Sequence, residues 1–266
     1  MSAVLQQTEG PILLRRDQGG VATLTLNRPN QFNALSEELL ETLDGTLAAI
    51  ADDSSVRVVV IAGAGRAFCA GHDLKEMRSQ YTLSYYQHLF RLCGRMMTRI
   101  IELPQPVIAR VHGIATAAGC QLVAMCDLAV AADVARFAVS GINVGLFCAT
   151  PSVGLARNMG RKDAFEMLVT GDFIDATEAR RRGLVNRVVA LEQLDEEVGR
   201  LAASICAKSP IAIKMGKQMF YRQMELGIEG AYQLAAESMA CNMMTEDAAH
   251  GIDAFMAKRT PEWKGR

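Results

Sequence analysis

Two segments that place small residues between a strand-like run and a helix-like run constrain the fold of this chain most. They span residues 66–77, reading RAFCAGHDLKEM, and residues 111–127, reading VHGIATAAGCQLVAMCD. Small residues at such a junction let the backbone come close to a ligand, and the first N–H groups of the following helix stay free to bind an anion or a polarised carbonyl. The two segments therefore predict an α/β fold with a site lined by backbone.

Strand and helix patterns alternate around these segments. Residues 12–16 and 21–27 read as a hairpin, and residues 56–62 (VRVVVIA) read as a strand covered on both faces. Ser36 has the features of an N-cap before a helix, and residues 118–125 read as a buried helix. The alternation predicts an α/β core.

The C-terminal part of the chain reads as helical over residues 211–258. We therefore expect a core over residues 1–200 and a helical C-terminal region over residues 201–266, together forming one functional unit. Several methionines in this region are expected to fill gaps between helices or in a subunit interface: Met215, Met219, Met224, Met239, Met243 and Met244.

The composition excludes several classes of protein. A formal net charge of −1 gives no electrostatic reason to expect binding to nucleic acid or to an anionic membrane. No apolar run approaches the roughly 18 residues that a membrane span needs. The histidines and cysteines show no metal-binding spacing, so we expect no metal site.

The cysteines and the start of the chain bear on its location in the cell. Seven cysteines without a CxxC pair, most of them among apolar or small neighbours, are typical of reduced, buried thiols. The first residues, MSAVLQQTEG, lack a basic region followed by an apolar stretch, so we expect no secretory signal. Together these features predict a cytoplasmic protein.

Five stretches, in order along the chain, resemble the enoyl-CoA hydratase/isomerase (crotonase) superfamily. They are LTLNRPNQFNAL (24–35), AGHDLKEM (70–77), GIATAAGCQLVAMCDLAVAAD (113–133), GDFIDATEARRRGLVNRVV (171–189) and GIDAFMAKRTPEW (251–263). Their agreement at compatible spacing is far more specific than any single motif. Within the family, IATAAGCQLVA (114–124) and INVGLFCATP (142–151) are similar to the branch called enoyl-CoA hydratase domain-containing protein 3.

The resemblance implies a spiral of ββα units with a C-terminal helical trimerisation region, and a homotrimer or homohexamer that binds acyl-CoA thioesters. It implies no permanently bound cofactor, with coenzyme A entering as part of the substrate or ligand. Carried over by position, the family's oxyanion hole falls on the backbone N–H groups of His72 and Ala118. Two such groups can stabilise a thioester enolate by about 3–4 kcal/mol each. Ala70, Lys75 and Lys258 lie where the family approaches CoA.

The side chains that should move protons depart from the family pattern. The two glutamates of the family's hydratases match Gln121 and Gly141 here. A glutamine amide does not titrate near neutrality, and glycine has no side chain, so the hydratase mechanism does not carry over intact. Asp127 matches an aspartate typical of the family, for which we expect hydrogen bonding at the helix end.

Three substitutes for the missing carboxylates stay open. By analogy with another branch of the family, bicarbonate, water or a substrate carboxylate could occupy space left at Gly141. The His72 imidazole could titrate near neutrality, or it could be a loop histidine whose backbone alone matters. Cys148 and Thr150 fall near positions where other branches carry polar catalytic groups.

Three functions follow from these observations. The first is an enzyme of hydratase/isomerase type acting on an acyl-CoA enolate, although not an efficient hydratase. The second is an acyl-CoA-binding protein without catalysis. The third is an acyl-CoA hydrolase that uses a water held by Gln121.

Overall fold

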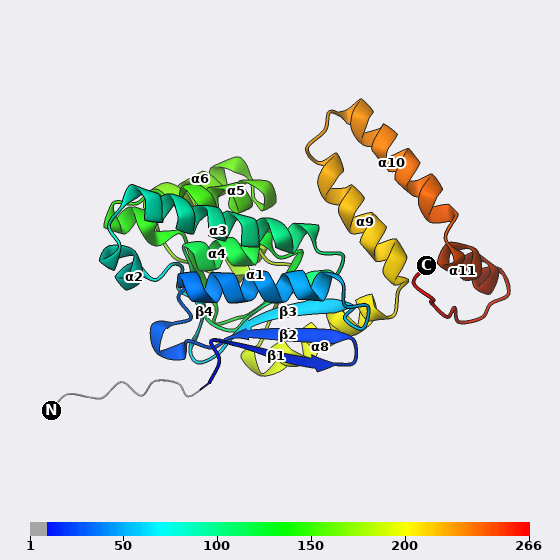
Figure 1. The fold of residues 1–266 in the computed structure, drawn as a ribbon, viewed down its shortest axis with the longest axis horizontal. Helices are drawn as coiled ribbons and strands as arrows, with labels where there is room; N and C mark the ends of the chain where they lie inside the picture. Colours follow the sequence, from blue (N-terminus) through cyan, green and yellow to red (C-terminus); the bar gives the residue numbers. More distant parts are fainter. Residues whose placement is uncertain (1–9) are drawn as a thin grey trace.

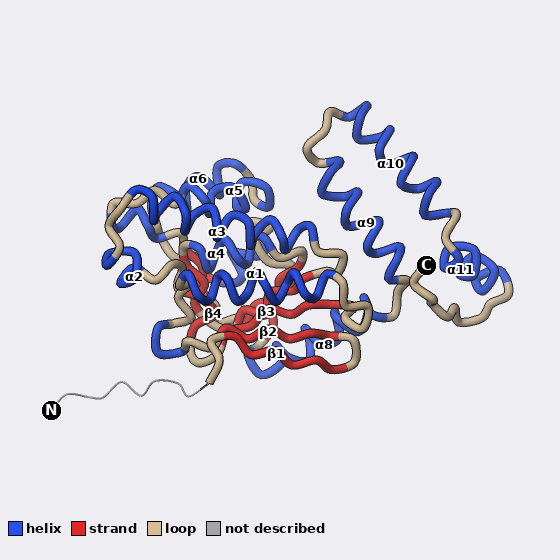
Figure 2. The backbone as a smooth tube through the Cα atoms, in the orientation of Figure 1, coloured by secondary structure: helices blue, strands red, loops and turns tan. Residues whose placement is uncertain are grey.

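The computed structural model describes residues 10–266 and contains two sheets (Figures 1 and 2). The larger sheet has six strands, in the order β1 (Leu13–Gln18), β2 (Val21–Leu26), β3 (Val58–Gly63), β5 (Val107–Val111), β7 (Leu128–Ala132) and β10 (Arg187–Val189). The smaller sheet has four, in the order β4 (Ala67–Cys69), β6 (Ile114–Thr116), β8 (Arg136–Ala138) and β9 (Ile174–Asp175).

Consecutive strands of the core alternate between the two sheets. The chain passes from β3 to β4, then from β5 to β6, and then from β7 to β8. The strands that become neighbours in this way pair in parallel. Each turn of the chain therefore adds one strand to each sheet, which is the predicted spiral.

Helices cover both faces of the larger sheet. Leucines of α1 (Glu37–Ala51) and α3 (Leu83–Glu102) pack with the strands in one core, and α8 (Leu194–Cys206) covers the opposite face (Figure 1). The predicted cap is confirmed, because the Ser36 side chain accepts a hydrogen bond from the Leu39 N–H at 3.3 Å. Burial on both faces explains why residues 58–62 are all apolar and buried.

Shorter helices surround the site region. They are α2 (Leu74–Ser79), α4 (Ala118–Met125), α5 (Ala149–Asn158), α6 (Arg161–Thr170) and α7 (Ala176–Arg181), with 3-10 turns at Pro29–Gln31, Ser140–Val144 and Leu191–Gln193. The bounds predicted for the buried helix agree with α4. The sequence did not predict β9 and β10, because strands of two and three residues are too short to show a period of two.

Residues 207–266 form what we call the C-terminal arm, which extends away from the core (Figure 1). It contains α9 (Pro210–Gln223), α10 (Ile228–Met243) and α11 (Glu246–Met256). The arm exposes many large apolar side chains, among them Phe220, Met224, Ile228, Tyr232, Met239, Met243 and Phe255. The division at residue 200 stays a prediction, and that position falls within α8.

Candidate active site

The two small-residue segments meet in the folded chain. Gly71 has a φ of +93°, and a Cβ atom placed there would lie 2.8 Å from the Ala117 Cβ and 3.2 Å from the Ala118 nitrogen. Glycine is therefore required at position 71 for both its backbone conformation and the close packing. The backbone next to His72 and the start of α4 are thus direct neighbours.

Helix α4 is fixed tightly at its first turn. A Cβ on Gly119 would lie 2.1 Å from the carbonyl oxygen of Cys69, so only glycine lets α4 pack this closely against β4. Ala117 precedes the helix with φ 50° and ψ −120°, a strained conformation for a residue with a side chain, and its N–H donates to Ala138 O at 3.0 Å. This conformation of Ala117 leaves the Ala118 N–H at the N-terminal end of α4, where the helix itself provides no acceptor.

Two backbone N–H groups are left without acceptors at this junction. The loop around His72 is held by bonds on either side, from Leu35 N to Gly71 O at 2.7 Å and from Asp73 N to Leu35 O at 3.2 Å. Among residues 10–266, neither the His72 N–H nor the Ala118 N–H donates a hydrogen bond. Both groups are therefore available to a ligand oxygen.

A cavity of about 300 Å³ lies against both groups. Its lining includes six of the residues that the sequence singled out: Ala70, His72, Ala118, Gly141, Cys148 and Thr150. Most of the other lining side chains are apolar, including Phe90 of α3 and Phe147. The lining contains no Asp, Glu, Lys or Arg, so a ligand here meets backbone N–H groups in apolar surroundings.

The His72 imidazole lies against Phe90 at the cavity wall, with the ring centroids 5.5 Å apart in an edge-to-face arrangement. Burial lowers the pKa of His72 to about 4, although the Leu35 backbone nearby offsets part of this effect. Neither ring nitrogen has a partner in hydrogen-bonding geometry. The prediction that this ring titrates near neutrality is therefore wrong, and the imidazole is neutral at pH 7.

Neighbouring atoms occupy the place that a Cβ on Gly141 would take. A Cβ on Gly141 would lie 2.7 Å from the Cys148 Sγ and 2.7 Å from the Leu146 carbonyl oxygen. A side chain at position 141 therefore has no room in that direction. Gly141 itself lines the cavity, so an anion or water beside it stays a prediction. Burial raises the pKa of the Cys148 thiol, which stays protonated and is directed to Val139 O at 3.6 Å.

Gln121 does not lie in the cavity lining. Gln121 belongs to α4, its side chain is buried, and its Oε1 atom has no hydrogen-bond partner. A water held by Gln121 would therefore have to reach the cavity past other residues. Thr150 does line the cavity, as does Cys148.

The residues predicted to contact CoA are separated. Ala70 lines the cavity, and Lys75 is exposed in the first turn of α2, next to the lining residue Leu74. Lys258 follows α11, which lies on the far side of the molecule from α2 (Figure 1). Within one chain, the structure therefore does not bring Lys258 to this cavity.

One further group of side chains has a geometry suited to a metal ion. Within residues 10–266, only Glu37, Glu41 and His88 bring three candidate ligand atoms together. The Glu37 carboxylate and the His88 Nε2 already lie 2.9 Å apart on the surface. Exposed clusters of this kind are common without a metal.

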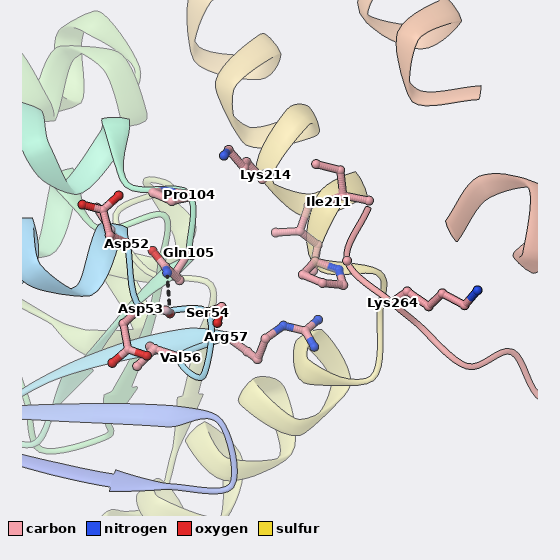
Figure 3. Close-up of a pocket in the computed structure, with 14 residues that line it drawn as sticks. Asp52, Asp53, Ser54, Val56, Arg57, Pro104, Gln105, Ile211, Lys214 and Lys264 are labelled. Carbon is pink, nitrogen blue, oxygen red and sulfur yellow. Dashed lines mark hydrogen bonds between the residues drawn. The ribbon is translucent and has the colours of Figure 1, made fainter. Parts of the chain in front are cut away.

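A second cavity, of about 430 Å³, lies between the core and the C-terminal arm (Figure 3). Asp52, Arg57 and Gln105 line it from the core, and Ile211 and Lys214 line it from α9. None of the residues predicted for the site belongs to it. The predicted site residues that line a cavity therefore belong to the smaller of these two cavities.

A sequence model of the enoyl-CoA hydratase/isomerase family matches residues 16–266, and the chain belongs to this family. Enoyl-CoA hydratase domain-containing protein 3 of Xenopus laevis is 45% identical over 262 residues, which cover 98% of this chain and 88% of that protein.

Solved structures confirm the predicted fold. A crystal structure of an enoyl-CoA hydratase from Mycobacterium smegmatis has a TM-score of 0.94 and 61% identity, covering 96% of this chain and 99% of that one. The crystal structure of human enoyl-CoA hydratase domain-containing protein 3 has a TM-score of 0.93 and 42% identity, covering 95% and 100%. The predicted branch of the family is confirmed by the same similarities.

The comparison corrects the predicted location. The relatives of this branch from Xenopus laevis, Rattus norvegicus and Homo sapiens are named as mitochondrial proteins. The cytoplasmic prediction is therefore wrong, because reduced, buried thiols indicate a reducing environment and do not identify the compartment. Among residues 10–266, no helix is both long and apolar enough to cross a bilayer.

Proposed function

We propose that this protein binds an acyl-CoA thioester in the smaller cavity and stabilises negative charge on the thioester oxygen with the His72 and Ala118 N–H groups. The observation that carries the proposal is the pair of free N–H groups at an apolar cavity, one of them at the first residue of α4. The dipole of α4 acts in the same direction, and the apolar surroundings strengthen both interactions.

Efficient hydration of an enoyl-CoA is not part of the proposal. Hydration needs groups that activate water and protonate the α-carbon, and the lining contains no carboxylate. The neutral His72 imidazole and the protonated Cys148 thiol are the titratable side chains of the lining. The thiol is protonated near pH 7 and cannot accept a proton, whereas the neutral imidazole keeps a nitrogen lone pair. His72 is therefore the one candidate base among these two side chains.

Binding of acyl-CoA without catalysis is the second candidate function. The lack of any carboxylate in the cavity lining favours it. The alternative of a hydrolase using a Gln121-held water has no such support, because Gln121 lies outside the cavity lining. A measurement of product formation therefore distinguishes an enzyme acting on an acyl-CoA from a protein that only binds it.

The CoA part of the ligand would lie outside the apolar cavity. Lys75 is exposed and follows the lining residue Leu74, and its ammonium group would contact a phosphate of CoA, while the Ala70 backbone would border the thioester. Lys258 could act only from another copy of the chain. Coenzyme A is thus proposed as part of the ligand and not as a resident cofactor.

We also propose a homotrimer or homohexamer assembled through the C-terminal arm. The support is the set of large apolar side chains that the arm exposes in one chain, including Tyr232 at 72% and Phe255 at 84%. Exposed apolar area of this kind marks an interaction surface. Light scattering should give a mass close to three or six times 28.8 kDa.

A panel of acyl-CoA esters tests the function. Each ester, crotonyl-CoA included, is incubated with the protein, binding is measured by calorimetry, and products are identified by mass spectrometry. We expect saturable binding and no hydration of crotonyl-CoA at ordinary enzymatic rates. Absence of binding to every ester would contradict the proposal, and rapid hydration would contradict the role assigned to Gln121 and Gly141.

A further inference from the structure

The aspartate that follows α4 connects the candidate site to the C-terminal arm. Asp127 lies two residues after the end of α4, and Ala118 is the first residue of the same helix. The Asp127 Oδ2 accepts a hydrogen bond from the Val107 N–H at 2.6 Å, which ties it to the start of β5. Its remaining partners both come from α9.

Lys217 of α9 reaches into the core with all three of its protons bonded. Its Nζ donates to Ile100 O at 2.8 Å, to Gln105 O at 3.0 Å and to the Asp127 Oδ2 at 2.6 Å. Gln105 itself lies at the junction between core and arm in Figure 3. A buried ammonium with three acceptors holds one geometry, since any shift leaves a charge without a partner.

Tyr221, one helical turn further along α9, completes the cluster. Its hydroxyl donates to the Asp127 Oδ1 at 2.8 Å, so the two carboxylate oxygens are held by different residues of the arm. Side chains of Lys217 and Asp127 are only 6% and 12% exposed. Burial raises the pKa of Asp127 and lowers that of Lys217, while their mutual attraction opposes both shifts.

Helix α4 connects Asp127, which Lys217 and Tyr221 hold in place, to Ala118 at its other end. Each of its eight residues is buried, and Gly119 abuts the Cys69 carbonyl so closely that the helix has little freedom to turn or slide. A short, fully packed helix moves as a rigid element. A displacement at Asp127 would therefore reach the Ala118 N–H.

We infer that Lys217 and Tyr221 are positioning residues: by holding Asp127 they hold α4, and so they set the Ala118 N–H within the oxyanion hole. The contact between the arm and the core thus sets the position of the Ala118 N–H. The link to the oxyanion hole rests on the proposed function, whereas the restraint on α4 does not.

Hydrogen exchange tests the restraint on the ligand-free, full-length protein. Tyr221→Phe removes one hydroxyl and keeps the ring. Tyr232→Phe is the matched control: it makes the same change in α10 of the same arm and keeps the apolar ring that the proposed subunit interface would bury. Peptides covering residues 112–126 should exchange roughly tenfold faster in Tyr221→Phe and unchanged in Tyr232→Phe. Equal exchange in both variants and the parent would overturn the inference.

Lys217→Met gives an independent variant with a larger expected effect, because it leaves the Asp127 carboxylate buried without its cation. If this variant does not fold, Tyr221→Phe alone decides the question. Faster exchange over the whole protein, and not over residues 112–126 in particular, would indicate general loss of stability and would contradict the specific restraint.

A bound chromophore tests the link to the site. An acyl-CoA with a conjugated electron-donating group absorbs at longer wavelength when its thioester carbonyl is polarised by two N–H groups. At saturation, Tyr221→Phe should reduce this shift, and Tyr232→Phe should leave it unchanged. A shift that is identical in all three proteins would overturn the positioning role. No shift in the parent would contradict the proposed function, and the exchange data would still decide the restraint.

Discussion

The Cys148 Sγ lies 2.7 Å from the place that a Cβ on Gly141 would take. This sulfur, together with the Leu146 carbonyl oxygen, closes the direction in which a glutamate at position 141 would extend. The place of a side chain at position 141 is therefore filled by Cys148 and Leu146. The site thus differs from a hydratase site in its packing as well as in the missing glutamate.

Gly141→Ala should lower the free energy of unfolding by about 1–3 kcal/mol, because the added methyl overlaps a backbone oxygen that cannot turn away. Gly45→Ala is the control: Gly45 lies in α1 with nothing within 4 Å of its would-be Cβ, and we expect a gain of about 0.5–1 kcal/mol there. Urea denaturation measures both. A Gly141→Ala protein as stable as the parent would show that the space is open.

Ala117→Gly should stabilise the protein by about 0.5–1 kcal/mol. A glycine relieves the strain of φ 50° and ψ −120°, and this gain exceeds the added entropy of the unfolded chain. Ala49→Gly, at an exposed position in α1, should instead cost about 1 kcal/mol. Thermal or urea denaturation distinguishes the two, and a loss of stability in Ala117→Gly would mean that the conformation is not strained.

His72 should make stability depend on pH below neutrality. Its pKa falls from 6.5 to about 4 on folding, so as the pH drops the unfolded chain binds the proton first. The stability due to the neutral imidazole is complete above pH 6.5 and is lost as the pH falls towards 4, by about 3 kcal/mol in all.

His72→Leu isolates this effect, because it removes the imidazole and keeps the backbone N–H. The difference in unfolding free energy between pH 7.5 and pH 5 should be smaller in His72→Leu than in the parent, while binding of acyl-CoA at pH 7.5 should persist. His88→Leu serves as the control for an exposed histidine. Identical pH profiles for His72→Leu and the parent would contradict the burial of a neutral ring.

Gly71→Ala should weaken acyl-CoA binding by at least about tenfold, because the new methyl would lie 3.2 Å from the Ala118 nitrogen and would crowd a ligand oxygen there. Gly19→Ala is a control at which φ is also positive but no atom lies within 4 Å. Calorimetry with one acyl-CoA measures both, with stability checked in parallel. Unchanged affinity in Gly71→Ala would place the ligand away from this junction.

Local patterns predicted the features that depend on neighbouring residues. The Ser36 cap and the bounds of α4 follow from residue type and spacing within one or two turns. The hydrogen-bonding role expected for Asp127 is confirmed, but its partners Lys217 and Tyr221 are about 90 positions away, and no local pattern could reveal them.

Features that depend on three-dimensional packing were not predictable in the same way. The lowered pKa of His72 follows from burial, and the ring contacts Phe90, which only the fold brings near it. The occupied space at Gly141 depends on the path of residues 146–148, which return across it. The sequence could show which side chains are absent but not what packs in their place.

A structure with a bound, unreactive acyl-CoA analogue tests the central claim most directly. The account predicts the thioester oxygen at about 2.7–3.1 Å from both the His72 and the Ala118 backbone nitrogens, with no carboxylate against the α- and β-carbons. A thioester oxygen bound elsewhere, or an aspartate or glutamate beside those carbons, would contradict it.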